Sequence, residues 1–227
     1  MPVARRGTSE WDLRRYHGRN NRYPFTEVVA FVMRSFGGAA DRSAVRILDL
    51  GCGSAHHLLF LAQEGFAYYG IDGSADSIAL AAQRLQEAGY PAGTLACGTF
   101  DRLPYEDDFF DGVIDRGSLT CNRKRELPPL IAEARRILKP GGRLFSMLLH
   151  EQASSRLEGR VLGDGDYTDF GGRLEGAGAL HFTNTAEAQA LFAPFHIDDI
   201  ERIHRASEYP PSGNRSVTAW TVVTCRK

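Results

Sequence analysis

Short apolar runs alternate with helical stretches between residues 45 and 149, and this alternation limits the fold more than any other feature of the sequence. Strands that alternate with helices at this spacing form a parallel sheet with helices on both faces. Such sheets bind their ligands at the carboxyl ends of the strands. We therefore expect strands over residues 45–50, 66–71, 92–97, 110–115 and 143–149, and helices over residues 56–64, 74–88 and 127–138.

The flanking segments belong to the same domain, since 227 residues suffice for one large domain. Residues 1–40 form an N-terminal cap segment, in which Thr26 is the expected N-cap of a helix that ends near Phe36. Residues 151–182 are rich in glycine and acidic residues and show little periodicity, which indicates a lid-like insertion after the 45–150 core.

The C-terminal segment, residues 183–227, has the pattern of a short helix followed by two alternating strands, over 185–191, 197–203 and 217–225. Turn residues at 209–214 lead us to pair the two strands as an antiparallel hairpin.

The composition is that of a soluble globular protein, with 43% hydrophobic and 24% charged residues. A net charge of -1 favours neither a nucleic-acid nor a membrane partner. The scattered cysteines have no zinc spacing, and the N-terminus has no apolar run of the secretory type, so a cytoplasmic protein with reduced thiols is expected.

A glycine turn directly follows the first expected strand. Gly51 and Gly53 would let a ligand lie against bare backbone, and the next helix offers unpaired N–H groups. By itself the pattern also occurs in tight strand-to-helix turns that bind nothing. Asp72, at the end of the second strand, adds a carboxylate that can accept both hydroxyls of a ribose. Together the two features indicate a nucleoside ligand.

The turn does not have the dinucleotide pattern, because His56 stands where the third glycine would be. A bulky residue there obstructs the close helix–strand approach of a pyrophosphate site. The turn therefore favours a ligand without phosphate over NAD.

Four motifs, in family order, resemble those of class I S-adenosylmethionine-dependent methyltransferases: Ile47 to Gly53, Tyr69 to Ser74, Leu103 to Val113 and Ile137 to Leu144. The resemblance spans about residues 45–150. It implies a Rossmann-like, doubly wound α/β sheet of about seven strands, mostly parallel with an antiparallel last strand. It also implies S-adenosyl-L-methionine as the cofactor.

The resemblance assigns cofactor contacts by position. Gly51 and Gly53 would let the methionine part pass, Asp49 would organise the turn, and Asp72 would hold the ribose. The cofactor set is completed by Cys52, Gly73, the adenine-flanking Gly98, Thr99 and Phe100, Asp115, whose backbone would meet the methionine amino group, and Arg116. Many members have glycine where Ala55 stands and an acid where Thr99 stands.

Methyl transfer needs alignment and exclusion of water, and it needs a base only if the acceptor loses a proton. His150, at the end of the fifth strand, and His181 are the candidate catalytic bases, with His17 as a third histidine. Trp11, Tyr16, Tyr23 and Phe25 could form a cation–π wall. The candidate acceptor-binding residues are Tyr16, Tyr23, Arg116 and His150.

Asp164, Asp166 and Asp169 lack a full calcium-loop pattern, so no metal is expected. The expected function is methylation of a small molecule on O, N or S by a monomer or homodimer. The alternatives are a cofactor-binding protein without catalysis, an NAD-dependent oxidoreductase and a nucleic-acid methyltransferase.

Overall fold

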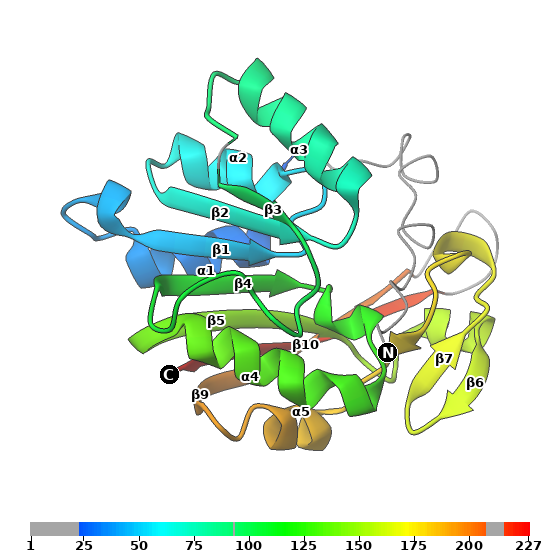
Figure 1. Cartoon of the computed structure of the whole chain (residues 1–227). Coiled ribbons are helices and arrows are strands. Elements are labelled where there is room, and N and C mark those ends of the chain that lie inside the picture. Colours follow the sequence, from blue (N-terminus) through cyan, green and yellow to red (C-terminus); the bar gives the residue numbers. More distant parts are fainter. Residues whose placement is uncertain (1–22, 93, 208–215) are drawn as a thin grey trace, which may run out of the picture.

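One seven-stranded sheet forms the centre of the molecule, in a computed structural model that describes residues 23–92, 94–207 and 216–227. The strand order is β3-β2-β1-β4-β5-β10-β9 (Figure 1). Neighbours from β3 to β5 pair in parallel, whereas β10 is antiparallel to both β5 and β9. The expected mostly parallel sheet with an antiparallel last strand is therefore confirmed. The strands are β1 (Arg46–Leu50), β2 (Ala67–Asp72), β3 (Leu95–Cys97), β4 (Phe110–Arg116), β5 (Leu138–Leu149), β9 (His196–Ala206) and β10 (Val217–Arg226).

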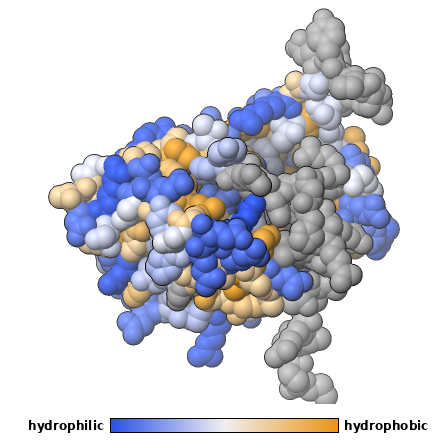
Figure 2. All heavy atoms as spheres, turned by 90° about the horizontal axis from the view of Figure 1, so that it is seen from above, coloured by the Kyte–Doolittle hydropathy of each residue, from blue (hydrophilic) through white to orange (hydrophobic). Residues whose placement is uncertain are grey.

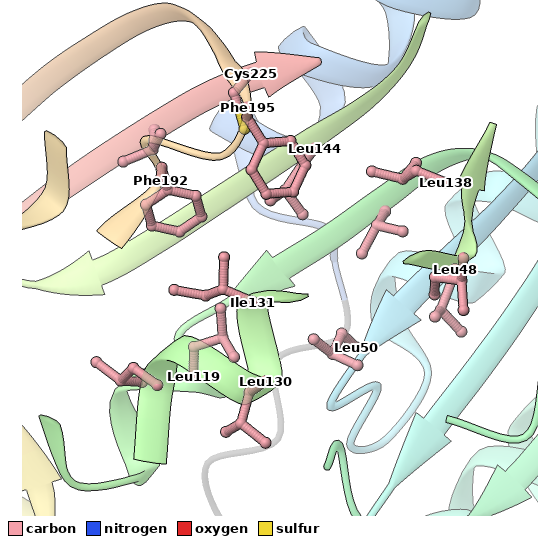
Figure 3. Close-up of a cluster of buried hydrophobic side chains, with 14 of the residues drawn as sticks. Leu48, Leu50, Leu119, Leu130, Ile131, Leu138, Leu144, Phe192, Phe195 and Cys225 are labelled. Carbon is pink, nitrogen blue, oxygen red and sulfur yellow. The ribbon is translucent and has the colours of Figure 1, made fainter. Parts of the chain in front are cut away.

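Helices cover both faces of this sheet. One apolar layer packs α4 and α5 against it through residues such as Leu144 and Phe192 (Figure 3). The other layer packs α1, α2 and α3 through Phe31, Leu58 and Leu85. The helices are α1 (Thr26–Phe36), α2 (His56–Gln63), α3 (Ala75–Glu87), α4 (Leu127–Ile137) and α5 (Thr185–Leu191).

The strand order reverses between β1 and β4, since the chain runs outward to β3 and then returns to the other side of β1. The connections after β1 and β4 leave the sheet in opposite directions there, which opens a crevice at the carboxyl ends of the strands. This geometry places the glycine turn after β1 beside the residues that end β4.

Two sequence expectations are corrected at element boundaries. Thr26 is the first residue of α1, and the N-cap is Phe25, whose side chain makes no capping hydrogen bond. Residues 139–142, which lie between the expected helix and the expected fifth strand, belong to β5 as an irregularity, where the partner of β4 jumps from Leu138 to Arg143. Gly141 adopts φ 77° there, a left-handed conformation that glycine takes without steric cost.

The insertion contains a small antiparallel sheet where the sequence analysis expected irregular chain. Its strands are β6 (Arg160–Gly163), β7 (Asp166–Thr168) and β8 (Leu180–His181), in that order. Phe170, Leu180 and Phe182 pack in an apolar cluster that also includes Leu149 of β5 and Ala219 of β10. The small sheet lies beyond the carboxyl ends of β4 and β5 (Figure 1).

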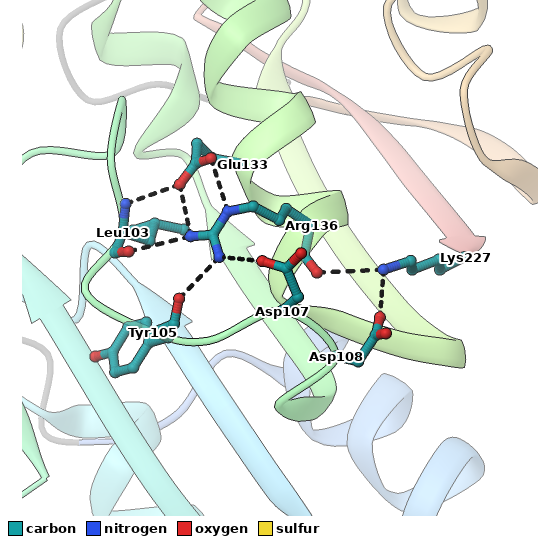
Figure 4. A network of polar contacts seen from close by, with 7 residues as sticks. All are labelled: Leu103, Tyr105, Asp107, Asp108, Glu133, Arg136 and Lys227. Atoms are coloured by element: carbon teal, nitrogen blue, oxygen red, sulfur yellow. Dashed lines mark hydrogen bonds and ion pairs between the residues drawn. The ribbon is translucent and has the colours of Figure 1, made fainter.

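Arg136 on α4 fixes the loop that leads into β4 (Figure 4). Its guanidinium donates to the carbonyl oxygens of Leu103 and Tyr105, at 3.1 and 2.8 Å, and pairs with Asp107 and Glu133. Glu133 also accepts the N–H of Leu103 at 2.9 Å. One side chain thus satisfies several polar groups of a loop that has no strand or helix of its own.

The surface seen from above mixes hydrophilic and hydrophobic residues (Figure 2). No helix in the described part of the chain is both long and apolar enough to cross a bilayer.

Replacing Arg136 by Gln should lower the free energy of unfolding by about 2 kcal/mol, because the variant leaves loop carbonyls and Glu133 without their charged donor. Urea denaturation followed by circular dichroism measures this. Arg135→Gln is the matched control, since Arg135 is a half-buried neighbour that donates only to the carbonyl oxygen of Pro194 in the hydrogen bonds of the described residues. Equal losses in the two variants would contradict a special role for Arg136.

Candidate active site

The glycine turn after β1 is held against β2 by its own backbone. The N–H groups of Gly51 and Cys52 both donate to the carbonyl oxygen of Ile71, at 2.8 and 3.0 Å. Gly51 has φ 81° and Gly53 has φ 50°, so both adopt the left-handed region. A Cβ on Gly51 would lie 1.8 Å from Ser118 Oγ, whereas a Cβ on Gly53 would meet nothing within 4 Å. The turn is therefore closed on one side and open at Gly53.

Asp72 joins this turn to the start of α3. Its Oδ2 accepts the N–H of Gly53 and its Oδ1 accepts the N–H of Ser74, both at 2.9 Å. A carboxylate oxygen has two lone pairs, so each oxygen keeps one for a ligand hydroxyl. Burial raises the pKa of Asp72 and outweighs these two bonds, which lower it.

The segment after β3 lies against the same turn. Gly98 donates its N–H to the carbonyl oxygen of Asp72 at 3.0 Å, and its own carbonyl oxygen lies 3.9 Å from the Cβ position of Gly73. The ring of Phe100 comes within 3.6 Å of the Cβ position of Gly51. The structure thus brings these expected cofactor residues together around the turn. Thr99 is exposed beside them.

The first turn of α2 begins without a side-chain cap. Its N-cap is Ala55, in the left-handed region at φ 67°, and no side chain accepts a hydrogen bond from the helix start. The N–H groups of a helix start attract negative groups when no cap satisfies them. This end of α2 lies directly after the open Gly53.

The side chains of Asp49 and Cys52 are buried away from the open side of the turn. Asp49 Oδ2 lies 3.2 Å from Nδ1 of His57 on α2, and both residues are almost fully buried. Burial raises the pKa of the Cys52 thiol well above its usual value. Asp49 thus links β1 to α2 through its contact with His57. The sequence analysis did not identify His57, although a buried aspartate always requires a partner.

Asp115 is fully buried at the end of β4. Its Oδ1 accepts the N–H groups of Ser118 and Leu119, at 2.8 and 3.0 Å, and its Oδ2 accepts the Ser146 hydroxyl at 2.6 Å. Its carboxylate shapes the chain after β4, which leaves its backbone as the part able to face a ligand. Burial raises the pKa of Asp115 to about 6, against the opposing effect of these bonds.

Arg116 packs between two aromatic rings. Its guanidinium carbon lies 3.7 Å from the ring centroid of Phe25 and 4.4 Å from that of Trp220. The ring of His56 also packs on Phe25, at 5.5 Å between centroids. Trp220 was not predicted from the sequence, and His56 was predicted only to disfavour a dinucleotide.

The two histidines proposed as bases are both buried, and neither contacts the turn in the hydrogen bonds of the described residues. His150 Nδ1 accepts the N–H of Gln152 at 3.1 Å, and burial lowers its pKa. His181 lies between Asp166 and Glu187, with ring nitrogens 2.8 and 3.3 Å from their carboxylates. A base must contact its substrate, so the catalytic role of both histidines stays a prediction.

The remaining predicted residues are exposed, engaged in other contacts or outside the described residues. Tyr23 is 76% exposed. Trp11, Tyr16 and His17, most of the cap segment and the turn at 209–214 lie outside the described residues. Asp166 is engaged by His181 and Lys124, and Asp169 pairs with Arg160. Within the described ranges no group of three or more His, Cys, Asp or Glu is placed to hold a metal ion.

A family model described as a methyltransferase domain matches residues 47–142, which contain the glycine turn, Asp72 and Asp115. Residues 47–142 of the chain therefore match a methyltransferase domain, as the resemblance of its motifs implies. An uncharacterized methyltransferase of Bacillus subtilis is 25% identical over 75% of this chain and 65% of its own length.

Two further similarities extend this result. A ubiquinone/menaquinone biosynthesis C-methyltransferase of Paracoccus denitrificans is 35% identical over 47% of this chain and 43% of its own length. The solved structure of a SAM-dependent methyltransferase from Methanosarcina mazei covers 90% of this chain and 98% of its own, with a TM-score of 0.68 and 22% identity. The chain spans about half to two thirds of the length of the curated relatives it matches.

The methyltransferase turn gives a matched pair of variants. Gly51→Ala should lower the free energy of unfolding by more than about 2 kcal/mol, because it adds a clash with Ser118 to left-handed strain. Gly53→Ala should cost only about 1 kcal/mol of strain, yet it should weaken S-adenosylhomocysteine binding because its methyl group fills the open space. Denaturation and calorimetry measure the two effects. Unchanged affinity in Gly53→Ala would show that the ligand does not pass there.

The raised pKa of Asp115 predicts that the free energy of unfolding depends on pH. The folded protein keeps a proton on Asp115 up to about pH 6, whereas the unfolded chain releases it near pH 4, so the folded state binds more protons in between. As pH rises from about 4 to about 6, the free energy of unfolding should therefore fall relative to that of Asp115→Asn.

Urea denaturation at several pH values measures this difference, with the exposed Asp101→Asn as control. A difference that does not change across this range would mean that Asp115 is ionised throughout.

Proposed function

We propose that this chain transfers a methyl group from S-adenosylmethionine to a small-molecule acceptor. The observation that carries the proposal is the bond from Gly53 to Asp72. It sets a carboxylate with free lone pairs beside a turn whose Gly53 faces open space. A nucleoside with an extended, phosphate-free tail fits this arrangement, with its ribose at Asp72 and its tail along the turn.

The other residues around the turn would contact the adenine, the amino group and the carboxylate of the cofactor. Phe100 and Gly98 would flank the adenine, the backbone at Asp115 would receive the amino group, and the uncapped start of α2 would face the carboxylate. S-adenosylmethionine supplies a methyl group that is already activated on its sulfonium. The chain's own contribution is therefore alignment and exclusion of water.

The acceptor atom is left open by these residues. The Paracoccus relative is named for C-methylation, so carbon joins oxygen, nitrogen and sulfur as a candidate. A small molecule is favoured over nucleic acid because the net charge is only -1. The four cysteines are unpaired, which fits the reducing cytoplasm.

Asp72→Asn should weaken S-adenosylhomocysteine binding by about 2 kcal/mol, because an amide replaces the carboxylate that accepts the ribose hydroxyls. Asp76→Asn, an exposed change in the first turn of α3, is the matched control and should leave the affinity unchanged. Isothermal calorimetry measures both. Equal affinities would mean that Asp72 only orders the turn.

S-adenosylhomocysteine should also raise the melting temperature of the wild-type protein, whereas NAD should not. A shift with NAD alone would overturn the cofactor assignment. Transfer of a labelled methyl group into a metabolite pool then separates an enzyme from a protein that only binds the cofactor. Absence of any labelled product would favour the binding protein.

A further inference from the structure

A half-buried guanidinium without a carboxylate partner lies next to the glycine turn. In the hydrogen bonds and ion pairs of the described residues, Arg116 has no acceptor, and its Nε is buried and unpartnered. Burial lowers the pKa of Arg116 to about 10, so it stays charged at neutral pH. Taking a charge out of water without a partner is costly.

The acidic side chains that act electrostatically on Arg116 do not form an ion pair with it. Glu27, in the first turn of α1, makes its ion pair with the exposed Arg205 at 2.7 Å. The carboxylate oxygens of Asp115, the preceding residue, accept hydrogen bonds from the N–H groups of Ser118 and Leu119 and from the Ser146 hydroxyl. Glu27 and Asp115, whose charges raise the pKa of Arg116, thus make their hydrogen bonds and ion pairs elsewhere, and the donors of Arg116 remain for a ligand.

Aromatic rings hold the guanidinium in position. Phe25 and Trp220 contact it from two elements, and the same Phe25 packs against His56. Both ring nitrogens of His56 are buried without a hydrogen-bond partner. Burial lowers the pKa of His56 to about 4, so at neutral pH its ring is uncharged and can donate one hydrogen bond. Arg116 and His56, which both have unpartnered nitrogens, thus pack on the same aromatic ring, that of Phe25.

The position of Arg116 favours the acceptor over the cofactor. Across the sheet the order is β2, β1, β4, β5 and β10, with Asp72 on β2 and the glycine turn after β1. Arg116 is the last residue of β4, and its guanidinium stacks on Trp220 of β10. In the sheet, β10 lies two strands beyond β4, on the side away from β1. The charge of Arg116 therefore lies on the side of the turn opposite to Asp72, where an acceptor would approach.

We propose that Arg116 binds an anionic group of the methyl acceptor, a carboxylate or an ionised hydroxyl, with His56 as a neutral hydrogen-bonding neighbour. The proposal rests on the proposed methyl transfer, because it assigns the anion to the acceptor. A planar guanidinium fixed between rings presents two parallel donors, which suits the two oxygens of a carboxylate.

The test uses benzoate and the uncharged benzamide as probes, titrated by calorimetry into the full chain saturated with S-adenosylhomocysteine. Benzoate should bind about tenfold more tightly than benzamide, and Arg116→Gln should abolish that preference. Arg205→Gln removes the same charge from the exposed neighbour and should keep the preference within about twofold. Arg116→Lys should retain part of it, since the charge remains but the planar fork is lost.

A stability measurement separates this role from a structural one. If Arg116 serves a ligand, Arg116→Met should leave the melting temperature of the free protein unchanged or raised, because an unpaired buried charge is removed while the packing is kept. A clear fall in melting temperature would mean that the aromatic sandwich is a structural support, and would overturn the proposal.

Three further outcomes are decisive. Equal binding of benzoate and benzamide, or a benzoate preference that survives in Arg116→Gln, would overturn the anion site. A tenfold loss of S-adenosylhomocysteine affinity in Arg116→Gln, without loss of 5′-methylthioadenosine affinity, would assign Arg116 to the cofactor carboxylate instead. Failure of the wild-type protein to bind S-adenosylhomocysteine would overturn the proposed function, and benzoate titration of the free protein would then test the anion site alone.

Discussion

The carboxylate of Asp72 accepts one N–H from the glycine turn and another from the start of α3. These two bonds connect the chain after β1 with the chain after β2, which the parallel register of the two strands has already brought side by side. Without them the turn would lose its contact with the side chain proposed to hold the ribose. The proposed cofactor site therefore depends on a polar contact between two strand ends, and the apolar layers serve to bring those ends together.

The charges of the site follow a common rule, in which a buried polar side chain has a partner unless a ligand is to supply it. Asp115 and Asp49 have partners within the fold, and both organise backbone. Arg116 and His56 have unpartnered nitrogens within the described residues, and both pack on Phe25. Asp72 holds the turn through two hydrogen bonds and keeps free lone pairs, so it both organises the site and is proposed to bind a ligand there.

The sequence was sufficient to predict the large sheet because its parallel strands are apolar runs and its last two strands alternate apolar with polar residues. Asp72 and the glycines were recognisable because they stand at strand ends with family spacing. The insertion strands were missed because they are only two to four residues long and lack an alternating pattern. The Arg116 cluster was missed because Phe25, His56 and Trp220 come from three distant segments that meet only in the folded chain.

The two ends of the insertion are neighbours. Thr183 donates its N–H to the carbonyl oxygen of Leu149 at 2.8 Å, and Glu151 donates its N–H to the carbonyl oxygen of Thr183 at 3.1 Å. The segment between them packs on the body through an apolar cluster that includes Leu149 and Ala219, and the Thr120 hydroxyl donates to the carbonyl oxygen of His181. A segment of any length whose ends meet in this way could replace it with little strain on β5. Acceptor preference could therefore diverge between descendants of one ancestor by exchange of this cassette, while the large sheet stays the same.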